Sequence, residues 1–285
     1  MKKLISNLLL TSLLGGSIII SGCSKDGDPD KNKVTIKGSD TMARLVSSWA
    51  ERYMEKNSRI EISVTGGGSG TGIEALLNNT TDIAASSRSI RKKETASALK
   101  KKIKLVSTVV AKDGIAVIVN KANKISSIPL ELLSLIYTGD ITNWSNVGGS
   151  DKKIDVLSRG LNSDIYIFFQ KYILRKDDYA KGTLFGPTSF LAQTVNDNEN
   201  AIGYVELRYV DDSGENVKTL AIKTSKGNVF PSEETVKSGE YPIALPLLFY
   251  VNGEAAGNVK AFIDFCLSAE GQKIVSEIGF VPIAE

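Results

Sequence analysis

The sequence contains no histidine among its 285 residues. Histidine is the side chain that most often exchanges protons near neutral pH, and it is the commonest zinc ligand. Its absence argues against hydrolases that use a histidine base and against histidine-ligated metals. No nucleophile–base pair or metal-binding cluster is visible in the sequence either, so we expect a protein that is not an enzyme and that needs no cofactor or metal.

The sequence also has few cysteines and a small net charge. There are only two cysteines, Cys23 and Cys266, and the formal net charge is +3. Such a weak overall charge favours neither nucleic acid nor a membrane surface as a partner, so an anion would have to be bound by local geometry. Cys266 lies in an apolar helical pattern and is expected to be a small buried core residue.

Residues 1–22 have the pattern of a secretory signal peptide. Two lysines precede an apolar run over residues 4–20, which is too short and too loosely apolar for a good membrane-spanning helix. The run ends in small residues before Cys23, as in a bacterial lipobox, so we expect cleavage there and a lipid on Cys23. Residues 23–33 are polar and would tether the protein to the membrane. A coincidental cysteine after an ordinary signal is the alternative.

Strand and helix patterns alternate along the rest of the chain. Residues 34–36, 60–64 and 202–205 have the pattern of strands. The clearest helical face consists of Met42, Leu45, Val46, Trp49, Ala50 and Tyr53. This alternation predicts an α/β fold with mainly parallel sheets.

Other segments give more specific expectations. Residues 65–72 are predicted to form a glycine-rich turn, and a helix is expected to begin at Ile73. Residues 105–119 read as two strands that are joined at residues 112–114. The last long helix is expected around residues 259–267.

Two strand-like crossings, near residues 105–119 and 242–251, predict a molecule of two lobes. The first lobe would consist of residues 34–111 and 247–285, and the second of residues 112–246. A ligand would bind in the cleft between the lobes, at the ends of the strands.

Three loops share one physical character, because each joins a strand to the start of a helix and is rich in small hydrogen-bond donors. They are Gly38-Ser39-Asp40-Thr41, residues 65–72, and the segment from Ser158 to Ser163. The free N–H groups of helix N-termini suit an anion, and glycine lets the backbone approach it. Three such ends in one cleft would hold a small oxyanion, with Arg159 adding paired donors. The alternative is ordinary N-capping by Ser39, Ser69 and Ser163.

The glycine-rich loop does not match the nucleotide-binding or hydrolase motifs that it partly resembles. The glycine-rich loop has no P-loop lysine, and the acid that a dinucleotide-binding motif requires is missing. Ser69 does not sit in a nucleophile elbow, and no histidine could activate it.

Several segments resemble the phosphate-binding protein of phosphate ABC transporters, within the type II periplasmic-binding-protein superfamily. The resemblance covers about residues 34–283 and rests on GSDT at 38–41, TGGGSGTGI at 65–73, DIAASSR at 82–88, DGIAVIVN at 113–120, YTGDITNW at 137–144, NAIGYV at 200–205 and FIDFCLSAEGQKIV at 262–275. It implies a monomer with an interlobe cleft that captures inorganic phosphate and delivers it to an ABC transporter permease.

The resemblance also implies which residues bind the phosphate. The matching positions of this chain are Ser39, Asp40, Thr41, Ser69, Ser87, Arg159 and Ser163. Asp40 would act mainly through its backbone N–H group.

This chain departs from the family pattern at two places. It has Ser163-Asp164-Ile165 where the family has S-G-T, and Ser87 where some members carry an aspartate that accepts the phosphate proton. One hypothesis is that Asp164 takes over as the proton acceptor and so joins the phosphate-binding residues. The other is that Asp164 only stabilises the helix N-terminus through its dipole, which contributes about 0.3–1 kcal/mol.

Two other functions stay open because of these departures. The chain could bind another oxyanion, such as sulfate or molybdate. It could also be a surface protein that kept the fold as an adhesion or sensing module.

Overall fold

The computed structural model describes residues 32–175 and 177–283. The predicted signal peptide over residues 1–22 and the predicted lipidation site Cys23 lie outside the described residues, as does most of the predicted tether. Among the described residues, no helix is both long and apolar enough to cross a bilayer.

The chain alternates between strands and helices, as the sequence predicts. The strands are β1 (Lys33–Gly38), β2 (Glu61–Thr65), β3 (Ile83–Ser86), β4 (Leu105–Asn120), β5 (Ser127–Pro129), β6 (Asp155–Arg159), β7 (Leu184–Gly186), β8 (Ala201–Glu206), β9 (Val217–Thr219), β10 (Ala221–Thr224), β11 (Gly227–Val229) and β12 (Ala244–Asn252). The α-helices are α1 (Asp40–Lys56), α2 (Ser69–Leu77), α3 (Lys92–Lys100), α4 (Leu130–Thr138), α5 (Asp164–Tyr172), α6 (Thr188–Asp197), α7 (Glu233–Ser238), α8 (Gly257–Leu267) and α9 (Ala269–Ile278).

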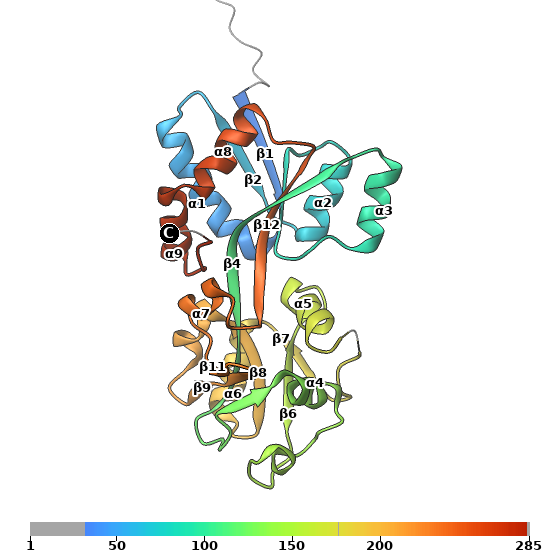
Figure 1. Ribbon diagram of the computed structural model, residues 1–285, viewed down its shortest axis with the longest axis vertical. Coiled ribbons are helices and arrows are strands. Elements are labelled where there is room, and N and C mark those ends of the chain that lie inside the picture. Colours follow the sequence, from blue (N-terminus) through green and yellow to red (C-terminus); the bar gives the residue numbers. More distant parts are fainter. Residues whose placement is uncertain (1–31, 176, 284–285) are drawn as a thin grey trace, which may run out of the picture. The chain divides into compact units, whose positions relative to one another are not determined.

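The main sheet is mixed rather than mainly parallel. Its strand order is β2-β1-β3-β12-β4-β8-β6-β7, with β9 also paired to β4. The strands at both ends pair in parallel, whereas β12 and β4 in the middle are antiparallel to each other and to their outer neighbours. The expectation of mainly parallel pairing fails in the middle because β4 and β12 carry the chain in opposite directions (Figure 1).

β4 is one continuous strand, not two segments joined at residues 112–114. Lys112, Asp113 and Gly114 face Pro246, Leu245 and Ala244 of β12, so they keep strand geometry. The backbone of Lys112 also exchanges two hydrogen bonds with Val281, from the end of the described chain. A partner strand more than 130 residues away therefore overrides the local turn signal, which sequence patterns do not record.

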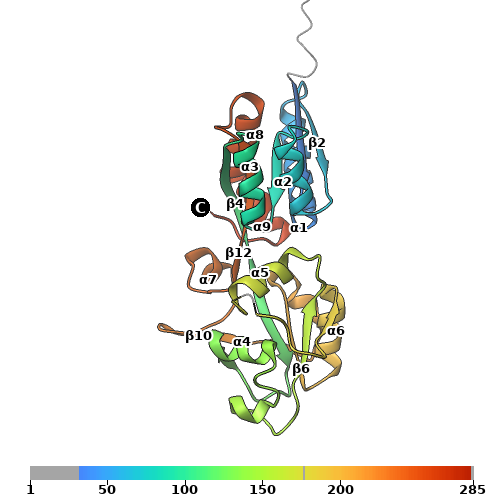
Figure 2. The ribbon, with the colours of Figure 1, turned by 90° about the vertical axis from the view of Figure 1, so that its right-hand side faces the viewer.

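Two large hydrophobic clusters lie along the path of β4 and β12. The first contains the predicted face of α1, whose six residues are all buried, together with side chains of α8 and α9. The second contains Tyr137, Phe169 and Tyr204, from α4, α5 and β8. In Figures 1 and 2, β4 and β12 run from the helices around the first cluster to those around the second.

Several helix boundaries differ from the predictions. α2 begins at Ser69, inside the expected glycine-rich turn, and α6 was not predicted at all. α8 matches the helix expected around residues 259–267, but α9 was not predicted; it begins as a separate helix where the Ser268 hydroxyl accepts a hydrogen bond from the Gly271 N–H. Cys266 is a buried free cysteine, as expected.

Asp113 is a buried acid in the middle of β4. It is 1% exposed, and neither carboxylate oxygen accepts a hydrogen bond from the part of the chain that the structure describes. Burial, followed by the nearby charge of Glu206, raises the pKa of Asp113 to about 8, although Arg208, the nearby backbone N–H group of Leu207 and Arg159 oppose the shift. Between about pH 4 and pH 8, Asp113 is therefore protonated in the folded protein but ionised in the unfolded chain, where the pKa of aspartate is about 4.

This linkage predicts that Asp113 lowers stability as the pH rises from about 4 to about 8. We expect Asp113→Asn to raise the free energy of unfolding at pH 8 by an amount on the order of 1–3 kcal/mol, because the buried ionisation is removed. The gain should shrink toward pH 5, where the folded wild-type side chain is protonated anyway. Urea unfolding at pH 5 and pH 8 measures both values, with the exposed Asp212→Asn as a control. A gain that is independent of pH would contradict the assignment.

Candidate functional site

The predicted anion-binding loops all follow strands of the main sheet. The β1–α1 junction contains Ser39, the β2–α2 junction contains Ser69, and the β6–α5 junction contains Ser163 and Asp164. A fourth segment, with Ser87, directly follows β3. Parallel pairing of β1 with β2 and β3 places the first, second and fourth segments at one edge of the sheet.

The N-capping alternative does not describe these serines. Ser39 and Ser163 occupy the N-cap positions of α1 and α5, but neither side chain makes a capping hydrogen bond. The N-cap of α2 is Gly68, so Ser69 is not a cap at all. The hydroxyls of Ser39, Ser69 and Ser87 make other hydrogen bonds instead.

Those hydroxyls converge on the carboxylate of Asp164. Ser69 Oγ donates to Asp164 Oδ2 at 2.5 Å, and Ser87 Oγ donates to the same oxygen at 2.7 Å. Ser39 Oγ lies 2.8 Å from Ser87 Oγ, and since Ser87 already donates its proton, Ser39 is the donor of that pair. Asp164 thus contacts residues of two other segments besides its own helix. Stabilisation of the helix dipole does not include these contacts.

A cavity of about 460 Å³ lies beside this cluster. Of the predicted phosphate-binding residues, five line it, namely Asp40, Thr41, Arg159, Ser163 and Asp164. The other three, Ser39, Ser69 and Ser87, are buried and are in hydrogen-bond contact with Asp164 or with each other. The structure therefore brings all eight predicted residues to one place.

Asp40 also shapes the site through its side chain, which was not predicted. Its Oδ1 accepts a hydrogen bond of 2.8 Å from the Gly67 N–H group, so it ties the start of α1 to the glycine-rich loop. The approach is close, because a Cβ on Gly66 would lie 2.5 Å from the same oxygen.

Arg159 is held by an acid that the sequence did not reveal. Its Nη1 donates to the two carboxylate oxygens of Glu206, at 3.0 and 3.1 Å, and to Thr188. Its Nε is buried and has no hydrogen-bond partner among the described residues. Glu206 and Thr188 thus fix the guanidinium at the wall of the cavity, and its Nε–H group remains available as a donor.

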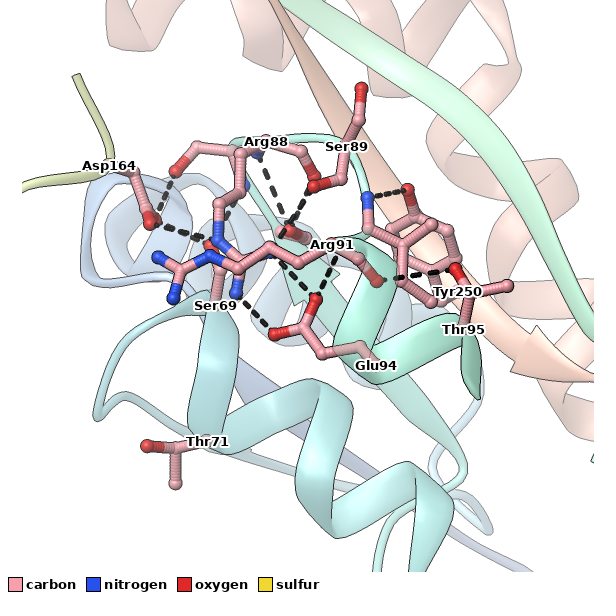
Figure 3. Close-up of polar contacts among 12 residues, drawn as sticks. Ser69, Thr71, Arg88, Ser89, Arg91, Glu94, Thr95, Asp164 and Tyr250 are labelled. Atoms are coloured by element: carbon pink, nitrogen blue, oxygen red, sulfur yellow. Dashed lines mark hydrogen bonds and ion pairs between the residues drawn. The ribbon is translucent and has the colours of Figure 1, made fainter. Parts of the chain in front are cut away.

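A second, partly buried ion pair adjoins Asp164. Both terminal nitrogens of Arg88 donate to Glu94, at 3.0 and 2.7 Å, and Arg88 Nε lies 3.5 Å from Asp164 Oδ1 (Figure 3). Burial opposes ionisation of Glu94, but hydrogen bonds from the Arg88 side chain and the Arg91 backbone lower its pKa overall. The one sequence signal for this pair is that Glu94 is a lone acid in a basic helix that begins four residues after Arg88.

The comparisons with known proteins agree with this architecture. A family model described as a PBP superfamily domain matches residues 24–270, and it confirms the predicted periplasmic-binding-protein fold. The phosphate-binding protein PstS of Bacillus subtilis (strain 168) is 32% identical over 99% of this chain and 95% of its own length. PstS of Staphylococcus haemolyticus is 30% identical over 98% of this chain and 92% of its own length.

Solved structures give the same result. An ABC-type phosphate transport receptor from Vibrio cholerae superposes with a TM-score of 0.75 and 30% identity, over 88% of this chain and 99% of the receptor. A putative phosphate ABC transporter substrate-binding protein from Clostridium perfringens, with bound phosphate, gives a TM-score of 0.71 and 31% identity, over 89% of this chain and all of that protein. The chain belongs to the PBP superfamily and, within it, to the family of phosphate-binding proteins that includes PstS.

Close backbone packing behind the site requires Gly72 of α2. A Cβ at this position would lie 2.3 Å from the carbonyl oxygen of Lys37 at the end of β1. We expect Gly72→Ala to lower the free energy of unfolding by about 1–3 kcal/mol, because β1 and α2 would have to separate. A Cβ on Gly160 would meet no atom within 4 Å, so Gly160→Ala should stay within about 0.5 kcal/mol of the wild type. Equal losses in urea unfolding would show that the packing is not limiting.

Proposed function

We propose that this protein is an extracytoplasmic solute-binding protein that captures inorganic phosphate and delivers it to an ABC transporter permease. One observation carries the proposal. A carboxylate, which is itself an oxyanion, is held by hydroxyl groups from two loops of the first part of the chain, beside a cavity with an arginine in its wall. The names of the relatives, which are phosphate-binding proteins and phosphate transport receptors, support phosphate rather than sulfate or molybdate as the ligand.

The proposed ligand site consists of the eight residues described above. The hydroxyls of Ser39, Ser69 and Ser87 would turn from Asp164 to the phosphate oxygens, and Arg159 would add a charged donor. Asp40, Thr41 and Ser163 lie at helix N-termini and would contribute N–H groups and hydroxyls. No covalent step is involved, so the protein would bind its ligand and release it unchanged.

Asp164 is proposed to receive the proton of the bound phosphate. Once the serine hydroxyls turn to the ligand, its carboxylate becomes free to accept a hydrogen bond. Phosphate carries a proton near neutral pH and sulfate does not, so a carboxylate would face sulfate without any hydrogen bond between them. Burying an acceptor without a hydrogen-bond donor costs free energy, so the site would bind sulfate more weakly than phosphate.

Location and lobe organisation are also proposed. Residues 1–22 would be removed as a signal peptide, and a lipid on Cys23 would anchor a monomer to the bacterial membrane through the tether, residues 23–33. The lobes would be residues 34–111 with 247–285, and residues 112–246. Movement of the two lobes about β4 and β12 would enclose the ligand in the cleft.

Calorimetric titration tests the ligand. Purified protein is stripped of phosphate by partial unfolding and dialysis and is then titrated separately with phosphate, sulfate and molybdate. We expect one-to-one binding of phosphate without competition from the other two. Ser69→Ala should weaken phosphate binding about 10- to 100-fold, because a hydrogen bond to a charged ligand is lost. Ser238→Ala, an exposed serine remote from the site, is the control. A folded protein that binds none of these anions would exclude phosphate transport and point to an adhesion or sensing module.

Asp164→Asn separates the two roles of this carboxylate. If Asp164 accepts the phosphate proton, the variant should admit sulfate as a competitor, since the charge that repels it is gone. Competition titrations with both anions measure this effect, with Asp212→Asn as an exposed control. If the variant keeps both its phosphate affinity and its rejection of sulfate, Asp164 is not the proton acceptor.

A further inference from the structure

Arg88 occupies an unusual position directly after Ser87. Its side chain is 5% exposed and points toward Asp164, as Figure 3 shows. It lies against the first turn of α2, where a Cβ on Gly70 would be 3.5 Å from Arg88 Nη2. A buried guanidinium must be compensated by nearby acceptors, because an unpaired buried charge is strongly destabilising.

Glu94 compensates only one edge of this guanidinium. Its two oxygens accept from Nη1 and Nη2 of Arg88, and Nη1 also donates to the backbone oxygen of Ser89. The backbone N–H of Arg91 holds Glu94 in turn, at 2.8 Å. These contacts fix the plane of the guanidinium and therefore the direction of its remaining edge.

A further donor of Arg88, Nε–H, lies beside the candidate site. Arg88 Nε is buried and makes no hydrogen bond with any described residue, although it lies 3.5 Å from Asp164 Oδ1. The other oxygen of the same carboxylate receives the hydroxyls of Ser69 and Ser87. The three donors therefore surround one oxyanion, and the arginine is the one whose hydrogen bond is still unmade.

We propose that Arg88 is a further phosphate-binding residue, whose Nε–H completes the donor set of Ser69 and Ser87, and that Glu94 is its positioning residue. This inference rests on the proposed function, since it places phosphate where the Asp164 carboxylate now receives these donors. Arginine only donates hydrogen bonds at accessible pH. Arg88 therefore strengthens binding without distinguishing phosphate from sulfate, which leaves that distinction to Asp164.

Arg88→Lys tests the role of Arg88, because lysine keeps the positive charge but not the planar set of donors. We expect the dissociation constant for inorganic phosphate to rise about 10- to 100-fold, with sulfate still excluded. Arg52→Lys makes the same chemical change in an exposed ion pair of α1 and should leave the dissociation constant unchanged.

A second measurement uses the unmodified protein, in case Arg88→Lys does not fold. The Nε–H signal of Arg88 in ¹⁵N NMR spectra should move when inorganic phosphate is added, because the group gains an acceptor. In Glu94→Gln this response should be lost and phosphate binding should weaken. If Glu94 served folding alone, the variant would melt at a lower temperature but keep the Nε–H response.

The outcomes separate the two proposals. If the unmodified protein binds phosphate, but Arg88→Lys binds it equally well or the Nε–H signal does not respond, the assignment of Arg88 is wrong and the proposed function stands. If the unmodified protein does not bind phosphate, the proposed function fails and the assignment fails with it.

Discussion

The partly buried carboxylate of Asp164 is the constraint on which the candidate site depends. A carboxylate can stay charged away from water only when several donors surround it, and the donors here come from segments far apart in the sequence. Ser69 begins α2 and Ser87 follows β3, whereas Asp164 begins α5, which packs into the second hydrophobic cluster. The carboxylate therefore brings three chain segments to the same point, and Ser39, whose hydroxyl bonds to Ser87 in this cluster, makes no capping hydrogen bond to α1.

Two partly buried ion pairs lie at this site and are built in a similar way. Glu94 holds Arg88, Glu206 holds Arg159, and in both arginines the Nε atom is buried without a hydrogen bond to any described residue. Each acid uses one part of a guanidinium and leaves another part directed elsewhere. Glu206 also acts on Asp113 in β4, where its charge helps to raise the pKa of that acid to about 8. An electrostatic connection thus runs from the cavity wall to the strand that joins the two hydrophobic clusters.

Local patterns predicted what depends on local sequence. The buried face of α1 was predicted residue by residue, because a period of 3.6 records burial directly. The start of α2 was placed too late, because its first turn is glycine-rich and carries no apolar signal. β4 was divided at Asp113, because its continuity depends on pairing with β12. All eight predicted ligand residues meet at one site, whereas Arg88, Glu94 and Glu206 were missed. Glu206 pairs with Arg159 from 47 residues away, and Glu94 pairs with Arg88 six residues before it, so neither pair follows a helical or strand period.

The course of β4 and β12 has a consequence for the order in which the protein folds. The second hydrophobic cluster is built almost wholly from residues 115–245, whereas the first combines residues from β1 with residues as late as Phe280. When a chain emerges from its N-terminus onward, all of the second cluster except Val281 can form while the first still lacks most of β12 and all of α8 and α9. Contacts distant in sequence form slowly. Until they form, the apolar face of α1 is covered only in part, by early strands such as β1 and β2, so one of the earliest parts of the fold to emerge is among the last to be fully protected from aggregation.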